Sequence, residues 1–181
     1  MSDQEFWKKD AEIGELSVFL EAYEDATGES LAMVGCSERP DFICERQDGI
    51  LVGVELTRVM RDPESATCEL IMMRREFRDP MDAIDHIWPT AERKSQKLKA
   101  GSWHYADNTI LVLQVMDCPL SELCWLLEEC SSPDDYADLG FSEVWVADYS
   151  ELDAYMVIEL FGLYPQRWWG YRERDRGKPY G

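Results

Sequence analysis

Apolar residues recur at two different periods along the chain, and the period separates the expected helices from the expected strands. Between residues 6 and 23 they return every three or four positions, as on one side of an amphipathic helix, and Gly28 follows as a C-cap. The same period predicts helices over 89–100 and 120–129. Residues 67–80 are charged and interrupted, which favours a short helix or an insertion.

Shorter runs of β-rich residues predict the strands. These runs cover residues 31–34, 41–46, 50–59, 109–115, 143–147 and 155–163. Gln47-Asp48-Gly49 joins the second and third runs as a hairpin turn. The run 109–115 is almost wholly apolar, which is typical of a central strand covered on both faces. The order of elements predicts an α/β fold in which helices flank a mixed sheet.

The length and composition favour one domain with an appendage. The chain has 181 residues, of which 45% are hydrophobic and 30% charged, enough for one real core. We expect this domain over residues 1–165 and a basic, aromatic carboxyl-terminal tail over 166–181 that contains Trp168 and Trp169. Such a tail suits single-stranded nucleic acid. The alternative, favoured by the acidic composition, is that its tryptophans pack on the domain and its arginines pair with acidic groups.

Charge and cysteine content restrict the function further. Eighteen basic against 37 acidic residues give a net charge of −19, so any contact with nucleic acid must be local. Six cysteines without a Cys-x-x-Cys pair, and only two histidines, argue against structural zinc. With no secretory signal and no long apolar stretch, we expect a cytoplasmic protein without membrane contact, whose thiols are reduced and mostly buried.

Two acidic residues of the hairpin carry the candidate chemistry. If the turn is a three-residue loop, Arg46 pairs with Ile50, and Asp41 then lies opposite Glu55 on the same face. A two-residue turn would place Leu56 there instead. Two neighbouring carboxylates repel each other unless a cation lies between them, and their oxygens suit Mg²⁺ or Mn²⁺.

The segment Pro40-Asp41 followed by Glu55-Leu56-Thr57 resembles the motif of the PD-(D/E)XK nuclease superfamily, which has the restriction-endonuclease-like fold. The resemblance implies a core over roughly residues 5–115: a helix, a three-stranded meander, a helix and a further strand. It also implies that Asp41 and Glu55 hold a divalent metal, while a lysine two residues after the second acid positions the attacking water. Thr57 stands at that place and supplies no positive charge.

Some members of the superfamily carry the lysine on the following helix, and Lys94 fits that position. With Ala91 and Leu98 on the inward face, Lys94 lies on or beside the buried stripe, whereas Lys97 projects further out. The alternative is that Lys94 only extends along apolar surface.

The superfamily also often carries an acid on the first helix. With Leu16 at the centre of the apolar stripe, Glu12 faces inward, and Glu15 and Glu21 turn outward. The alternative is that Glu12 is a carboxylate at the stripe edge, favoured by the helix dipole.

Two functions remain open. The first is metal-dependent hydrolysis of a phosphodiester by a nuclease, with Asp41, Glu55 and Glu12 as ligands of Mg²⁺ or Mn²⁺ and Lys94 near the nucleophile. The second is a non-catalytic interaction or immunity-type protein on the same fold, whose acidic surface binds a basic protein partner. Thr57 and the net charge favour the second; the opposed acids and Lys94 favour the first.

Overall fold

The computed structural model describes residues 3–59, 79–150 and 157–173, with side chains from residue 8 onward. Its helices are α1 (Asp3–Thr27), α3 (Pro80–Ile84), α4 (Ile87–Lys99), α5 (Leu120–Cys130) and α6 (Pro133–Ala137), with short 3₁₀ turns η1 (Ala106–Asn108) and η2 (Gln166–Trp168). Its strands are β1 (Leu31–Cys36), β2 (Phe42–Arg46), β3 (Leu51–Arg58), β4 (Thr109–Val115), β5 (Glu143–Asp148), β6 (Leu160–Tyr164) and β7 (Gly170–Arg172).

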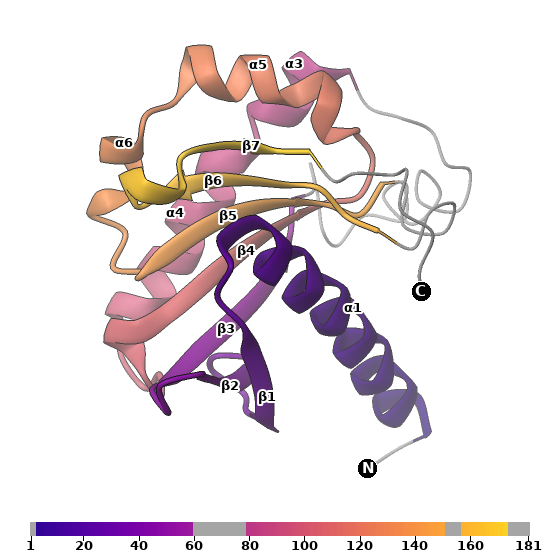
Figure 1. Cartoon of the computed structure of the whole chain (residues 1–181), viewed down its shortest axis with the longest axis vertical. Helices are drawn as coiled ribbons and strands as arrows, with labels where there is room; N and C mark the ends of the chain where they lie inside the picture. Colours follow the sequence, from indigo (N-terminus) through magenta and orange to yellow (C-terminus); the bar gives the residue numbers. More distant parts are fainter. Residues whose placement is uncertain (1–2, 60–78, 151–156, 174–181) are drawn as a thin grey trace.

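All seven strands form one mixed sheet whose spatial order equals their order in the chain. The β1–β2–β3 meander is antiparallel, β3, β4 and β5 run parallel, and β6 and β7 return antiparallel. Figure 1 shows α1 on one side of this sheet and α3, α4 and α5 on the other. The expected α/β fold with a mixed, helix-flanked sheet is therefore confirmed at this level.

Each face of the sheet has its own hydrophobic core. On the α1 side, Leu16, Phe19 and Tyr23 pack against alternate positions of the central strands. On the other side, helices α3–α6 pack against the intervening positions, such as Leu111 and Leu113. Every residue of β4 is buried, as its apolar sequence predicts for a strand covered on both faces.

The elements begin and end within a few residues of the expected positions, with differences at the segment ends. The first helix extends four residues past the expected end at Tyr23, and α4 begins two residues before Pro89. Of the charged segment 67–80, only the last two residues are described, and Pro80 begins α3. The strand expected over 155–163 is found as β6, and residues 155–156 lie outside the described part.

The first residues of the expected tail are part of the sheet. They form η2 and β7, and the rings of Trp168 and Trp169 lie against Trp145 and Phe161, with centroids 6.2 and 5.2 Å apart. A Cβ at Gly162 would lie 1.9 Å from the backbone oxygen of Trp168, so only glycine lets this segment cross β6 so closely. Residues 174–181 lie outside the described part.

The thiols are less buried than expected. Among the described cysteines, Cys44 and Cys118 are buried, Cys124 is half-buried, and Cys36 and Cys130 are exposed. The two exposed thiols lie at the ends of β1, an edge strand of the described sheet, and of α5. Within the described residues, no helix has the length and apolar character needed to cross a membrane.

Candidate functional site

The turn between β2 and β3 sets the register of the candidate site. The amide of Arg46 donates to the oxygen of Ile50 at 2.9 Å, and the amide of Gly49 donates to the oxygen of Arg46 at 2.9 Å. Gly49 has a φ of +84°, the left-handed conformation that closes a three-residue hairpin loop. The turn is therefore the three-residue loop, not the two-residue one.

This register places the two acids opposite each other. Phe42 pairs with Val54, so the residue before the strand, Asp41, continues the ladder opposite Glu55. The amide of Asp41 donates to Glu55 Oε2 at 3.1 Å, and the amide of Leu56 donates to Asp41 Oδ2 at 3.0 Å. The predicted cross-strand juxtaposition of Asp41 and Glu55 is thus found. The amide of Asp41 holds the Glu55 carboxylate, and the amide of Leu56, the residue after Glu55, holds the Asp41 carboxylate.

A glycine in the interior of β3 makes room for this arrangement. A Cβ at Gly53 would lie 2.5 Å from Cγ of Pro40 and 2.7 Å from Oγ1 of Thr109. Both distances are far shorter than ordinary contacts, so Pro40 can lie over β3 only because Gly53 has no side chain. Since Pro40 directly precedes Asp41, this contact fixes the position of the first acid.

The lysine of the site comes from α4. Lys94 Nζ donates a hydrogen bond to Glu55 Oε1, and the Lys94 side chain is only 17% exposed. On the same helix Ala91 and Leu98 are buried and Lys97 is exposed. Lys94 therefore points inward from the buried stripe, as its spacing predicts, and compensates the charge of a carboxylate that is 4% exposed.

Glu12 does not join this group. It lies on α1, which packs on the opposite face of the sheet from Glu55, and its carboxylate pairs with Lys9 at 3.4 Å and Lys8 at 3.9 Å. Its side chain is 33% exposed. The alternative interpretation, a carboxylate at the edge of the apolar stripe, describes this position better, although the charge of Glu12 still acts on Asp41.

The acid that turns inward from α1 is Glu15, so the expectation that it turns outward is wrong. Its side chain is 17% exposed, and its oxygens accept from Arg58 at 2.9 Å and from Gln114 at 2.8 Å. Arg58 and Gln114 are paired neighbours on β3 and β4, so the sheet supplies two donors for this carboxylate. Helical spacing alone carries no information about such partners.

The electrostatics of the pair favour a bound cation. Burial and the neighbouring charge of Glu55 raise the pKa of Asp41 to about 6, although the Leu56 amide and Lys94 favour the charged form. Within the described residues no group of three or more acidic, histidine or cysteine side chains could hold a metal. Two carboxylates nevertheless fit Mg²⁺, which keeps several waters and is often held by one or two acids.

No protein-family model, curated protein or solved structure matches this chain. The interpretation of the site therefore rests on its own residues: two acids on neighbouring strands, and one lysine reaching them from the next helix. Thr57 is 8% exposed and lies on the same face as Glu55, so a buried neutral side chain stands where the motif resemblance implies a lysine.

Local spacing in the sequence predicts the juxtaposition of Asp41, Glu55 and Lys94, but it gives no role to Gly53. The available signal was a glycine in the interior of a β-rich run, which often marks close approach of another backbone or ring. The pairing of Glu15 had no comparable signal, because Gln114 lies 99 residues away in the sequence.

Proposed function

We propose that this protein is a metal-dependent phosphodiester hydrolase, a nuclease of the PD-(D/E)XK-like type on a restriction-endonuclease-like core. The observation that carries the proposal is the convergence of three side chains: Asp41 from the residue before β2, Glu55 from β3 and Lys94 from α4. The order α1, β1–β3, α4 and β4 agrees with the helix, meander, helix and strand that the motif implies.

Each of the three side chains has a distinct task in this proposal. Asp41 and Glu55 would hold Mg²⁺ or Mn²⁺, which supplies charge neutralisation at the phosphoryl oxygens and a water of lowered pKa. Lys94, whose Nζ lies at the Glu55 carboxylate, would orient the attacking water. Thr57 takes no part in proton transfer, since its hydroxyl has no charge to offer.

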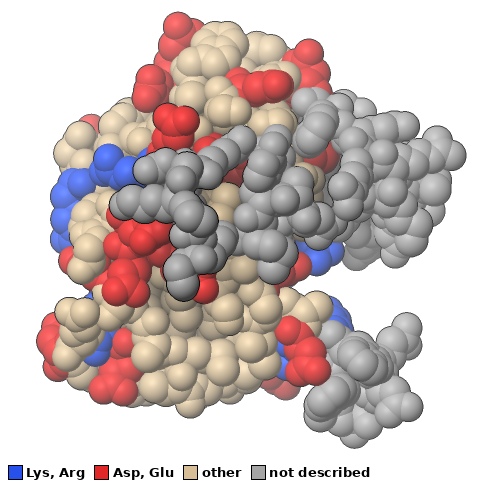
Figure 2. Space-filling view, turned by 45° about the vertical axis from the view of Figure 1, so that its right-hand side comes forward, with Lys and Arg blue, Asp and Glu red and all other residues tan. Residues whose placement is uncertain are grey.

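The overall charge restricts the substrate to local contacts. Figure 2 shows one face of the molecule, on which acidic side chains are widespread and basic side chains are confined to a few places. A nucleic acid approaching a protein with a net charge of −19 is repelled at long range. We therefore expect slow cleavage that depends strongly on divalent metal. The cleavage rate should fall as ionic strength is lowered, because repulsion is then less screened, whereas a basic nuclease would bind its substrate more tightly.

The test is a cleavage assay on single- and double-stranded DNA and RNA with Mg²⁺ or Mn²⁺, combined with metal titration by calorimetry. Asp41→Asn and Glu55→Gln should abolish cleavage and weaken metal binding, because each removes a ligand charge. Lys94→Met should abolish cleavage while retaining metal binding. That separation would assign the lysine to the water and the acids to the metal.

Two exposed residues provide matched controls. Glu45→Gln removes an exposed carboxylate from β2, and Lys97→Met removes an exposed ammonium from α4. Both variants should cleave and bind metal like the parent. Absence of cleavage and of metal binding in the parent would contradict the proposal and favour the non-catalytic alternative, in which the acidic surface binds a basic protein.

A further inference from the structure

A second polar site lies at the edge of the sheet where β3, β4 and β5 begin. A cavity of about 490 Å³ opens there, within the size range of small-molecule sites. Its lining includes Glu29, Arg46, Asp48, Asn108, Glu143 and Arg167. These residues come from the α1–β1 connection, the β2–β3 hairpin, η1, β5 and η2, so five separate segments meet around one cavity.

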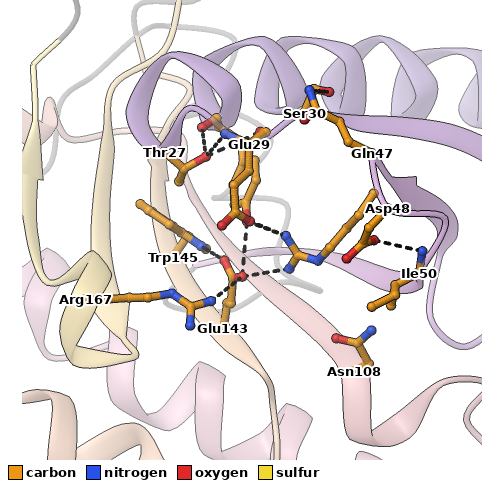
Figure 3. A network of polar contacts seen from close by, with 12 residues as sticks. Thr27, Glu29, Ser30, Gln47, Asp48, Ile50, Asn108, Glu143, Trp145 and Arg167 are labelled. Atoms are coloured by element: carbon orange, nitrogen blue, oxygen red, sulfur yellow. Dashed lines mark hydrogen bonds and ion pairs between the residues drawn. The ribbon is translucent and has the colours of Figure 1, made fainter.

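The inner wall of the cavity is a fixed charge network (Figure 3). Glu143 is 1% exposed, and its Oε1 accepts from the Tyr23 hydroxyl at 3.1 Å and from Arg46 Nη2 at 2.9 Å. Its Oε2 accepts from the Trp145 indole at 2.9 Å. The other amino group of Arg46 donates to Glu29 at 2.6 Å. The buried carboxylate is therefore held rigidly, which suits a preformed binding wall.

Arg167 occupies the open side of the same carboxylate without being bound to it. Its Nη2 lies 3.8 Å from Glu143 Oε1, beyond hydrogen-bond distance, and its side chain is 62% exposed. The guanidinium rests over the Trp168 ring, 5.0 Å from the centroid. A guanidinium of the chain itself thus lies loosely where a ligand cation would approach Glu143.

Apart from the N–H groups of Arg167, the hydrogen-bonding capacity that remains on the charged residues and Asn108 of the lining consists mainly of acceptors. Glu29 accepts from Arg46 through Oε2, and Asp48 accepts from the Ile50 amide through Oδ1 at 3.0 Å. The second oxygen of each carboxylate remains as an acceptor. Asn108 donates through its amide nitrogen to a backbone oxygen at 2.8 Å, so its side-chain oxygen remains for a ligand. Within the described part of the chain, these side-chain oxygens have no other hydrogen-bond partner.

The charges agree with this donor and acceptor balance. Three carboxylates and two guanidinium groups line the cavity, and the whole chain carries −19. A cation is therefore attracted both locally and at long range, whereas an oxyanion would have Arg167 as its only loosely held partner among the described lining residues. The planar, donor-rich cation that matches several oxygen acceptors is a guanidinium.

We propose that this cavity is a binding site for a guanidinium group, supplied by an arginine side chain or by a small guanidinium compound. The incoming group would displace Arg167 from the open side of Glu143 and donate to Glu29, Asp48 and the side-chain oxygen of Asn108. The site is separate from Asp41 and Glu55, and its occupation does not require metal.

The test is calorimetric titration of the metal-free protein with N-acetyl-arginine amide, which represents an arginine within a protein, and with free arginine. The neutral analogue N-acetyl-citrulline amide has a similar shape and should not bind. Tighter binding of the blocked compound indicates a protein arginine, and tighter binding of free arginine indicates a small molecule. Equal binding of the citrulline analogue, or no saturable binding at millimolar concentration, would overturn the proposal.

Variants of equal charge change separate a local contact from a general charge effect, because Glu45→Gln removes one negative charge outside the cavity, as Glu29→Gln and Asp48→Asn do inside it. Glu29→Gln and Asp48→Asn should each weaken binding about tenfold, the loss expected for one charge-assisted hydrogen bond. Arg167→Ala should tighten binding, since it removes the competing guanidinium without touching the buried network. Glu45→Gln, an exposed acid outside the cavity, should leave binding unchanged. Weaker arginine binding by Arg167→Ala, or acetate or phosphate binding that this variant loses, would show an anion site instead.

Discussion

Replacing Asp41 with Asn should stabilise the metal-free protein, although it removes a proposed metal ligand. The parent holds Asp41 half-buried, opposite the buried Glu55, and this environment raises its pKa from 3.8 to about 6. Asparagine is uncharged and retains an oxygen that can accept the Leu56 amide now bound at 3.0 Å. The variant therefore keeps the local hydrogen bond and loses the repulsion.

The magnitude follows from the pKa shift of Asp41. Each pKa unit corresponds to about 1.4 kcal/mol, so a rise from 3.8 to about 6 means that the charged group costs roughly 3 kcal/mol of folding free energy. Because the raised pKa belongs to an acid, the protein lacks this cost below pH 3.8 and bears it fully above about pH 6. The stability contributed by this group is thus lost as pH rises across that window.

The assay is urea unfolding of parent and Asp41→Asn at a series of pH values without divalent metal. We expect equal free energies of unfolding near pH 3.5 and an advantage of about 1–3 kcal/mol for the variant above pH 7. The difference between the two proteins cancels the titration of all groups that they share. Equal stability at every pH, or a less stable variant at neutral pH, would refute the electrostatic account of this site.

Two further predictions concern the surroundings of the acids. Lys94→Met should destabilise the protein by about 2–4 kcal/mol in urea unfolding, because the buried Glu55 carboxylate loses its cation. Added Mn²⁺ should restore part of this loss. The control variant Lys97→Met should change the free energy of unfolding by less than about 0.5 kcal/mol. Gly53→Ala should cost roughly 1–3 kcal/mol through its clash with Pro40, and should reduce metal affinity by displacing Asp41. Metal binding equal to that of the parent in this variant would contradict the positioning role of Gly53.

The parts of the site that follow from local geometry could be predicted from the sequence. The facing of Asp41 and Glu55 depends only on the turn length and the alternation of strands, and the inward position of Lys94 depends only on the helical period. Both rules act over a few residues, so composition and spacing contain the necessary information.

The parts set by tertiary partners could not be predicted. Glu15 turns inward because Arg58 and Gln114 of the sheet donate hydrogen bonds to it, and no short-range sequence pattern predicts these contacts. The same limitation applies to Glu143, a carboxylate that begins a buried strand and finds Arg46 from a hairpin 97 residues earlier. Buried acids are costly without partners, so an acid in an apolar run indicates a network but not its members.

The neutral residue at position 57 offers a final test of how the site is built. Thr57 is 8% exposed and shares the face of Glu55, so Thr57→Lys alone would bring a second ammonium to a carboxylate that Lys94 already neutralises. We expect this single variant to be destabilised and to gain no activity, since burial of an unpaired charge is unfavourable.

Combining Thr57→Lys with Lys94→Met moves the one cation from α4 to β3, the position that the PD-(D/E)XK motif implies. The double variant should be more stable than the sum of the two single changes predicts, by about 1–3 kcal/mol, because one ammonium again serves one buried carboxylate. A double-mutant cycle in urea measures this coupling, and metal-dependent cleavage by the double variant measures whether the cation works from the strand. Purely additive losses of stability would mean that a lysine at position 57 does not reach Glu55, and that position 94 on the helix cannot be replaced by position 57 on the strand.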